Sequence, residues 1–313
     1  MGAWEVSTTP SAAHEQWAKE GQFLFASRQW AHVLEGLGCT TVFAWHHELE
    51  CGVVVPVFRR GPLRVAFLGF PIAGECFDAL NAAQFEALQH ALAGDLRCDL
   101  VRGVRSQALE PGPGALPEVW IDDLQAWPGS RGKRIAKDLA FAARAGGGRQ
   151  PVESFADGAV AYALYQQTVL GHGGRLRYTN EYFHRLLALA GQSSLLTAAA
   201  MQDGTSRTSA FAVTARHGRV AYYLHGAVEP SARACGDGDV LLARLIENAR
   251  KGGALSFSLM ASPRDQPGLV RYKSKWGDHQ GFTNTHDVGR GLLGRPLAYW
   301  VRRNSRLQGT GKN

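Results

Sequence analysis

Helix-like and strand-like segments alternate along this 313-residue chain, and the alternation limits the folds it can adopt. Strand-like runs and helix-like segments follow one another up to a basic helix at residues 130–145. That helix ends in Gly146-Gly147-Gly148, and the same alternation then starts again. The restart favours two α/β (α+β) units of related build, each with a mixed central sheet flanked by helices.

The glycine run also gives the expected domain boundary. The chain is long enough for two domains of about 150 residues each. We predict a first domain over residues 1–148 and a second over 149–313. In the second, periodicity predicts helices at 158–170, 181–190 and 239–252, and strands at 194–201, 208–216, 219–227 and 254–260.

Composition excludes several classes of protein. Hydrophobic residues make up 45% of the chain and charged residues 19%, as in soluble globular proteins. No uncharged apolar run approaches the roughly 18 residues that a membrane helix needs. The N-terminal segment has Glu5 and Glu15 and no secretory pattern. We therefore expect a cytoplasmic protein without a membrane span.

The cysteines predict neither a disulfide scaffold nor a metal site. Their number is odd, they are widely spaced, and none forms a CxxC pair; they are Cys39, Cys51, Cys76, Cys98 and Cys235. Buried thiols in a reducing compartment are the simplest interpretation.

The net charge of +7 permits an anionic partner. Of the 34 basic residues, 27 are Arg and 7 are Lys. Arginine suits bidentate contacts with phosphate or carboxylate. The same excess also follows from GC-rich coding, so it does not require such a partner.

The strand at 219–227 contains two tyrosines and a histidine. Strand alternation predicts that Tyr223 and His225 share one face, while Tyr222 and Leu224 share the other. Cross-strand packing would explain the tyrosines. Gly226 favours a site, because a glycine in a strand often marks a bulge or a close ligand approach.

Arg233-Ala234-Cys235-Gly236-Asp237-Gly238 follows this strand and precedes a helix. Such a loop can present backbone N–H groups to an anion. The string fits R-x-x-G-x-G, the pyrophosphate loop of GNAT acyl-CoA transferases. Asp237 and Asp239 oppose that interpretation, because carboxylates repel a pyrophosphate. Asp239 is more simply interpreted as a helix N-cap.

Residues 268–277 carry a run of basic side chains. On a strand or loop, the alternating Arg271, Lys273 and Lys275 would form one compact cationic face. That face could hold a phosphate or a polarised carbonyl. A solvated surface is the alternative.

Five stretches of the second half, in order, resemble the Fem-type (FemAB) aminoacyl and acyl transferases. They are FADGAVAYALYQQTVLGHG (155–173), YFHRL (182–186), YYLHGA (222–227), VLLARLIENARKG (240–252) and GLVRYKSKWG (268–277). Lys133 to Lys137 (KRIAK) is similar to the family's RKA segment. Upstream, the resemblance depends on Trp30 and on Val55-Pro56-Val57.

The chain departs from the family pattern at one arginine. The position expected to hold it after Leu-Tyr-x-x-Thr is Gly171, followed by His172. Arg175 or Arg177 could take its place. The family's aromatic residue before its lysine is Tyr272 here.

The resemblance implies two GNAT-like domains in tandem, the first on the acceptor side and the second on the acyl-donor side. The tail, 297–307, would pack back on the first domain. Lys273 matches the family lysine expected near the donor ester, where a cation could stabilise an oxyanion. Tyr222, Tyr223 and His225 would border the acceptor. His225 is the first candidate for a general base and His172 the second.

The candidate catalytic residues are therefore Lys273, His225 and Tyr223. The candidate substrate-binding residues are Tyr222, Tyr272, Lys275, Arg233, His172, Arg175 and Arg177. Gly236 and Gly238 would bind a cofactor only if the enzyme depended on CoA. No resident cofactor or metal is expected.

Three functions remain open. The first is an aminoacyl-tRNA-dependent transferase that forms an amide on an amine of a peptidoglycan precursor or of a peptide-like metabolite. The second is a GNAT-type N-acyltransferase that uses acyl-CoA or an acyl or peptidyl carrier protein. The third is a non-catalytic member that binds tRNA or a carrier.

Overall fold

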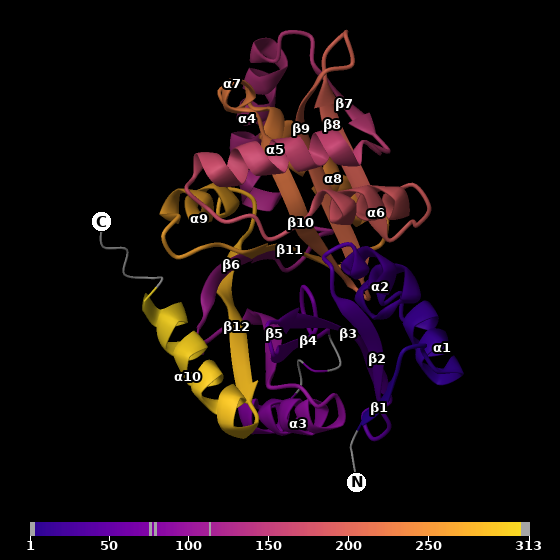
Figure 1. Cartoon of the computed structure of the whole chain (residues 1–313). Helices are drawn as coiled ribbons and strands as arrows, with labels where there is room; N and C mark the ends of the chain where they lie inside the picture. Colours follow the sequence, from indigo (N-terminus) through magenta and orange to yellow (C-terminus); the bar gives the residue numbers. More distant parts are fainter. Residues whose placement is uncertain (1–3, 75–76, 78–79, 113, 308–313) are drawn as a thin grey trace. The chain divides into compact units, whose positions relative to one another are not determined.

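A computed structural model describes residues 4–74, 77, 80–112 and 114–307, and it divides into two compact units (Figure 1). The first unit comprises Met1–Val119, Met260–Tyr272 and Gln280–Asn313. The second comprises Trp120–Leu259 and Lys273–His279. Each unit is a mixed sheet with helices packed against it.

The sheet of the first unit has the order β1-β2-β3-β4-β5-β12-β6. Its strands are β1 (Trp4–Ser7), β2 (Thr40–His46), β3 (Cys51–Arg60), β4 (Leu63–Leu68), β5 (Leu100–Ala108), β6 (Leu116–Ile121) and β12 (His279–Gly289). β4 pairs with β5 in parallel, whereas β1/β2, β2/β3, β3/β4 and β5/β12 are antiparallel. The helices are α1 (Ala12–Glu20), α2 (Arg28–Glu35), α3 (Ala82–Asp95), α9 (Pro267–Lys273) and α10 (Gly291–Leu307), with a 3₁₀ turn at Leu24–Ala26.

Strand alternation and helix caps explain how this unit forms. Val53, Val55 and Val57 of β3 enter one core with Phe85 and Leu92 of α3. The side chain of Ser27 caps α2, as its sequence predicts. Asn81 and Gln84 form a capping box that starts α3.

The sheet of the second unit has the order β11-β10-β9-β8-β7. The strands are β7 (Gln150–Glu153), β8 (Leu196–Gln202), β9 (Thr208–His217), β10 (Val220–Val228) and β11 (Ser256–Ala261). Only β10/β11 is parallel among these pairs. The helices are α4 (Gly132–Ala145), α5 (Gly158–Gly171), α6 (Asn180–Ala190), α7 (Pro230–Arg233) and α8 (Asp237–Lys251), with a 3₁₀ turn at Gly129–Arg131.

Helices cover both faces of this second sheet. On one face, Leu241 and Leu245 of α8 pack on small side chains of β8 and β9. On the other, Phe183 of α6 contacts the ring of Phe211 on β9. The mixed sheets flanked by helices confirm the predicted α/β class.

The compact units differ from the expected division at residue 148. The structure assigns α4 to the second unit, where it packs against α8. The chain also returns to the first unit at its end, because β12 pairs with β5 and α10 contacts β5. Sheet pairing between distant segments, which local composition does not encode, decides this division.

Several smaller expectations can be checked over the same residues. No helix in the described ranges is long and apolar enough to cross a membrane. Four cysteines, Cys39, Cys51, Cys98 and Cys235, are free thiols, while Cys76 lies outside the described residues. Within those ranges, His, Cys, Asp and Glu side chains form no group of three that could hold a metal ion.

Candidate functional site

A β-bulge in β10 shapes the candidate site of the second unit. Opposite β9, Tyr223 pairs with Thr214, but His225 pairs with the adjacent residue Val213. Leu224 is therefore the extra residue, and the alternation of side chains breaks there. Tyr223 and His225 consequently lie on opposite faces of the sheet, which corrects the prediction that they share one face.

Tyr223 lies on the face that carries α8. Its ring packs against the cluster formed by Leu241, Leu245 and the small side chains of β8 and β9. Its hydroxyl occupies the space where a side chain at Gly226 would begin. Burial raises the pKa of Tyr223 to about 12, so the phenol is neutral at physiological pH. Gly226 thus makes room for a tyrosine of the same strand.

His225 lies on the opposite face, within an aromatic cluster. Its Nε2 is 2.9 Å from the hydroxyl of Tyr182. The rings of Tyr178, Phe183 and Tyr182 lie 4.6, 5.2 and 5.5 Å from its ring. Burial lowers the pKa of His225 to about 3 and raises that of Tyr182. Both groups are neutral at physiological pH, an arrangement that suits hydrogen bonding better than strong general-base catalysis.

The segment between α5 and α6 holds three exposed candidates, His172, Arg175 and Arg177. The hydroxyl of Tyr165 accepts hydrogen bonds from the backbone N–H groups of Arg177 (2.8 Å) and Tyr178 (3.3 Å). Tyr178 also contacts the ring of His225. The segment therefore presents its arginines to solvent beside the aromatic cluster.

The first turn of α8 contains the glycine-rich loop. Gly236 adopts a left-handed conformation (φ 82°) and is the N-cap residue. Asp239 is thus the third residue of the helix, which corrects its expected role as N-cap. The loop arginine, Arg233, is exposed, and its Nε donates to the carbonyl of Val228 at 3.3 Å.

The two carboxylates of this turn are paired with other groups of the same unit. The side chain of Asp237 is 1% exposed and accepts hydrogen bonds from Ser209 Oγ (2.6 Å) and Arg149 Nε (2.8 Å). The carboxylate of Asp239 lies 2.8 Å from Lys275 Nζ. Both carboxylates of the turn are therefore neutralised by the chain itself.

Lys275 connects α8 with the basic helix α4. Its Nζ also lies 3.1 Å from Asp138 Oδ2 and 4.9 Å from the ring centre of Trp276. Only 8% of its side chain is exposed. The ammonium bridges two carboxylates, one from each helix.

Residues 267–273 form helix α9, which corrects the expected strand or loop. Arg271 is exposed and Tyr272 is partly buried, while Lys273 and Lys275 are buried. The three basic side chains therefore do not form one exposed cationic face. Helical backbone geometry at 267–273 removes the alternation on which that prediction depended.

The strand order around β10 decides the fold of this unit. A bulged strand is followed by a glycine-containing turn, a helix, and a strand parallel to the first. Residues 130–274, which span these elements, match the family model described as an acetyltransferase (GNAT) domain. The second unit has a GNAT fold. The match supports an acyl or aminoacyl transferase.

Solved structures agree with this GNAT fold. The crystal structure of FemX has a TM-score of 0.62 and 11% identity, over 95% of this chain and all of FemX. L-PGS from Bacillus licheniformis has a TM-score of 0.52 and 12% identity, over 97% of this chain and 98% of L-PGS. Among curated proteins, no match is found. The Fem-type resemblance predicted from sequence is confirmed for the fold.

The C-terminal domain of a putative lysylphosphatidylglycerol synthetase from Agrobacterium fabrum is also similar. Its TM-score is 0.50 at 14% identity, over 81% of this chain and 85% of that domain. Such low identities carry the fold and not the substrate.

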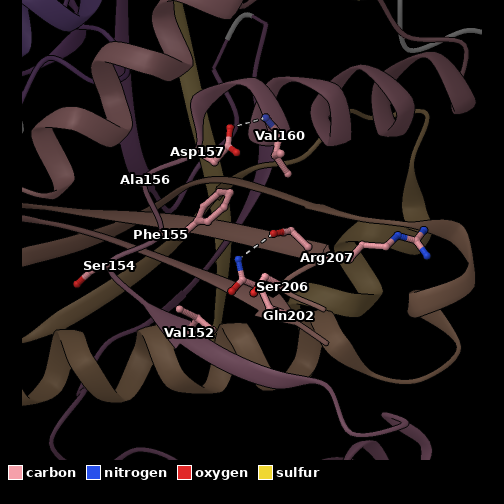
Figure 2. Close-up of a pocket in the computed structure, with 10 residues that line it drawn as sticks. Val152, Ser154, Phe155, Ala156, Asp157, Val160, Gln202, Ser206 and Arg207 are labelled. Atoms are coloured by element: carbon pink, nitrogen blue, oxygen red, sulfur yellow. Dashed lines mark hydrogen bonds between the residues drawn. The ribbon is translucent and has the colours of Figure 1, made fainter. Parts of the chain in front are cut away.

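The GNAT unit also contains a separate cavity of about 410 Å³ (Figure 2). Phe155 and Asp157 line it from the loop before α5, and the Asp157 carboxylate caps that helix by accepting from Val160 N–H at 3.0 Å. On the opposite wall, Gln202 donates to the hydroxyl of Thr208 at 3.1 Å. None of the predicted site residues lines this cavity.

Sequence reasoning missed the partners of the predicted residues. Arg149, Ser209 and Asp138 hold the charges of the loop and of Lys275. These pairs join distant parts of the sequence; Arg149 and Asp237, for example, are 88 residues apart. The sequence offered one local indication of these pairs: Asp138 is the single acidic residue of an otherwise basic helix.

Proposed function

We propose that this chain is an aminoacyl-tRNA-dependent transferase. It would join an amino acid, through an amide, to an amine of a peptidoglycan precursor or of a peptide-like metabolite. One observation carries the choice of donor: the first turn of α8 is already neutralised by groups of its own unit, through Asp237 and Asp239.

That neutralisation disfavours a CoA donor. A helix N-terminus binds diphosphate through open N–H groups and the positive end of the helix dipole. Here the carboxylates of Asp237 and Asp239 lie in that turn. A side chain at Gly236 would begin 2.8 Å from Cβ of Ala142, so α4 packs closely on the same loop. A diphosphate would have to displace these contacts.

Helix α4 offers a surface suited to RNA phosphates. Its exposed basic residues are Lys133, Arg134, Lys137 and Arg144. Phosphate contacts of this kind dominate the affinity of nucleic-acid-binding proteins and make it depend on salt. The net charge of +7 also favours the binding of a polyanion such as RNA.

The chemistry requires little from the protein beyond position and charge. The neutral acceptor amine would attack the ester carbonyl of aminoacyl-tRNA, forming the C–N bond and an oxyanion. The C–O bond to the ribose then breaks, and the proton released by the amine passes to the departing ribose oxygen, through solvent or a protein group. We assign the oxyanion to Lys273 and the placing of the acceptor to His225 and Tyr222. Tyr223, on the opposite face of the sheet, would support the strand that carries them.

Most of the remaining predicted residues would contact the substrates. Tyr272 directly precedes Lys273 in the chain, and we propose that it borders the donor ester. Lys275, two residues after Lys273, would hold α4 and α8 in place. Arg175, Arg177 and His172 would contact the tRNA or a phosphate of the acceptor, because all three are exposed. FemX and the putative lysylphosphatidylglycerol synthetase, the latter named for an aminoacylated product, support a transferase of this type. The proposed location is the cytoplasm, where charged tRNA occurs.

An acyl-CoA-dependent N-acyltransferase is the second candidate. The order of strand, loop, helix and parallel strand favours it, as does the R-x-x-G-x-G string at Arg233–Gly238. In that case Gly236 and Gly238 would contact the pyrophosphate. An acyl or peptidyl carrier protein would be the equivalent donor.

Binding of aminoacylated bulk tRNA across a salt series tests the proposal. Deacylated tRNA and CoA thioesters serve as competitors. We expect tighter binding of charged tRNA, a steep loss with salt and no competition by CoA thioesters. Displacement by a CoA thioester, with no preference for charged tRNA, would favour the second candidate.

A variant of Lys273 separates catalysis from binding. Lys273→Ala should abolish transfer from charged tRNA while circular dichroism shows a folded protein that still binds tRNA; Lys19→Ala, at an exposed lysine of α1, should leave transfer unchanged. Wild-type protein that binds charged tRNA but transfers nothing to any amine tested would indicate the non-catalytic role instead.

A further inference from the structure

Helix α10 leaves four large apolar and aromatic side chains exposed to solvent, while Leu297 and two small residues lie toward the sheet. Leu292, Leu293, Tyr299 and Trp300 are 95, 60, 67 and 61% exposed. Gly294 is buried, and Ala298 is 6% exposed. An ordinary surface helix has the opposite arrangement, with its large apolar residues against the core.

Close packing explains the inner face of the helix. A side chain at Gly294 would overlap the backbone carbonyl of Asp99, and one at Gly289 would overlap the backbone of Gly294. The inner face therefore needs small residues in order to reach β5 and β12, beside which α10 lies in Figure 1. This packing uses none of the four large exposed side chains.

The outer face combines apolar, aromatic and cationic groups. Arg295 is exposed between the leucines and the aromatic pair. The sequence of α10 contains four arginines and no acidic residue. Tyrosine and tryptophan favour places where one end of the ring is apolar and the other is wet. Leucine, tryptophan and arginine on one helix are typical of helices that lie in the headgroup region of a bilayer.

We propose that the outer face of α10 binds the surface of an anionic lipid bilayer. Leu292, Leu293 and Trp300 would enter the boundary between headgroups and acyl chains. Arg295 and the hydroxyl of Tyr299 would remain at the anionic headgroups. A second copy of the chain fits this face less well, because it would bring another Arg295 toward this one, and like charges repel. The proposal does not depend on the donor of the transferase.

Cosedimentation with lipid vesicles tests this proposal. The full chain should bind vesicles containing phosphatidylglycerol, bind vesicles of phosphatidylcholine much less, and lose binding as salt rises. Leu292→Glu combined with Leu293→Glu should weaken binding by about tenfold or more. Leu109→Glu, at another exposed leucine of the same unit (75%), should leave binding unchanged.

Three outcomes would overturn the proposal. One is no binding of the wild-type chain to anionic vesicles at low salt. Another is an equal loss with Leu109→Glu. The third is a dimer in sedimentation velocity that the double α10 variant dissociates, without any vesicle binding. Circular dichroism and tRNA binding of the double variant should match the wild type, which separates this test from that of the donor.

Discussion

The first turn of α8 and the outer surface of α4 carry charge in opposite ways. In α8, Asp237 and Asp239 are largely buried and each is paired with a basic side chain. In α4, Lys133, Lys137 and Arg144 are exposed. Charges of the first kind hold the fold together, because a buried charge without its partner is costly. Charges of the second kind cost little to keep and remain available to an anionic partner.

Loss of the Arg149 side chain should have the largest effect on stability. Arg149→Ala leaves the Asp237 carboxylate buried with only Ser209 as a partner. Breaking a buried ion pair from one side costs about 3–5 kcal/mol. Urea denaturation should show this loss. Arg207→Ala, at an ion pair whose arginine side chain is 68% exposed, should cost no more than about 1 kcal/mol. Equal losses in the two variants would refute the contrast between buried and exposed pairs.

Loss of Lys275 should come second. Lys275→Met leaves Asp138 and Asp239 facing each other without the ammonium between them. Because both carboxylates are partly exposed, we expect a loss of about 2 kcal/mol in the free energy of unfolding. Lys251→Met, at an exposed lysine of α8 paired with Glu247, should change it by no more than about 0.5 kcal/mol. If Lys275→Met unfolds at the same urea concentration as the wild type, the bridge does not stabilise the fold.

Acid should destabilise the second unit through its buried histidines. Burial lowers the pKa of both His217 and His225 to about 3. Between that value and an unfolded pKa of about 6.5, the unfolded chain binds more protons than the folded chain. Stability should therefore fall as pH drops below about 6.5, by up to about 1 kcal/mol per pH unit for each histidine.

A histidine variant isolates the contribution of His225. His225→Asn should flatten the slope of unfolding free energy against pH between about 6 and 4. His32→Asn, at an exposed histidine of α2, should leave the slope unchanged. An unchanged slope in His225→Asn would mean that solvent reaches the His225 ring.

The smallest effect on stability should come from α4. Lys133→Glu combined with Lys137→Glu should change the free energy of unfolding by no more than about 0.5 kcal/mol, because both side chains are exposed. Binding of charged tRNA should nevertheless fall by about tenfold or more, with a shallower dependence on salt. Filter binding at several salt concentrations measures the affinity for charged tRNA and its dependence on salt. Unaltered tRNA affinity would remove α4 from the proposed RNA surface.

Local patterns in the sequence predicted most of the elements, because they are encoded by neighbouring residues. The helix predicted at 239–252, which the structure has as α8, is an example. The bulge at Leu224 was not predictable, since it depends on how β10 pairs with β9. The pairing of Asp237 with Arg149 was missed for the same reason, because only the fold brings those residues together.

Titration of acetyl-CoA into the protein, followed by calorimetry at low salt, tests whether the first turn of α8 can bind a diphosphate. The first turn of α8 is neutralised by Arg149, Ser209 and Lys275. We therefore predict no saturable heat up to millimolar acetyl-CoA. Saturable binding in the micromolar range that Gly238→Glu abolishes would contradict the account, because it would place a diphosphate at this turn.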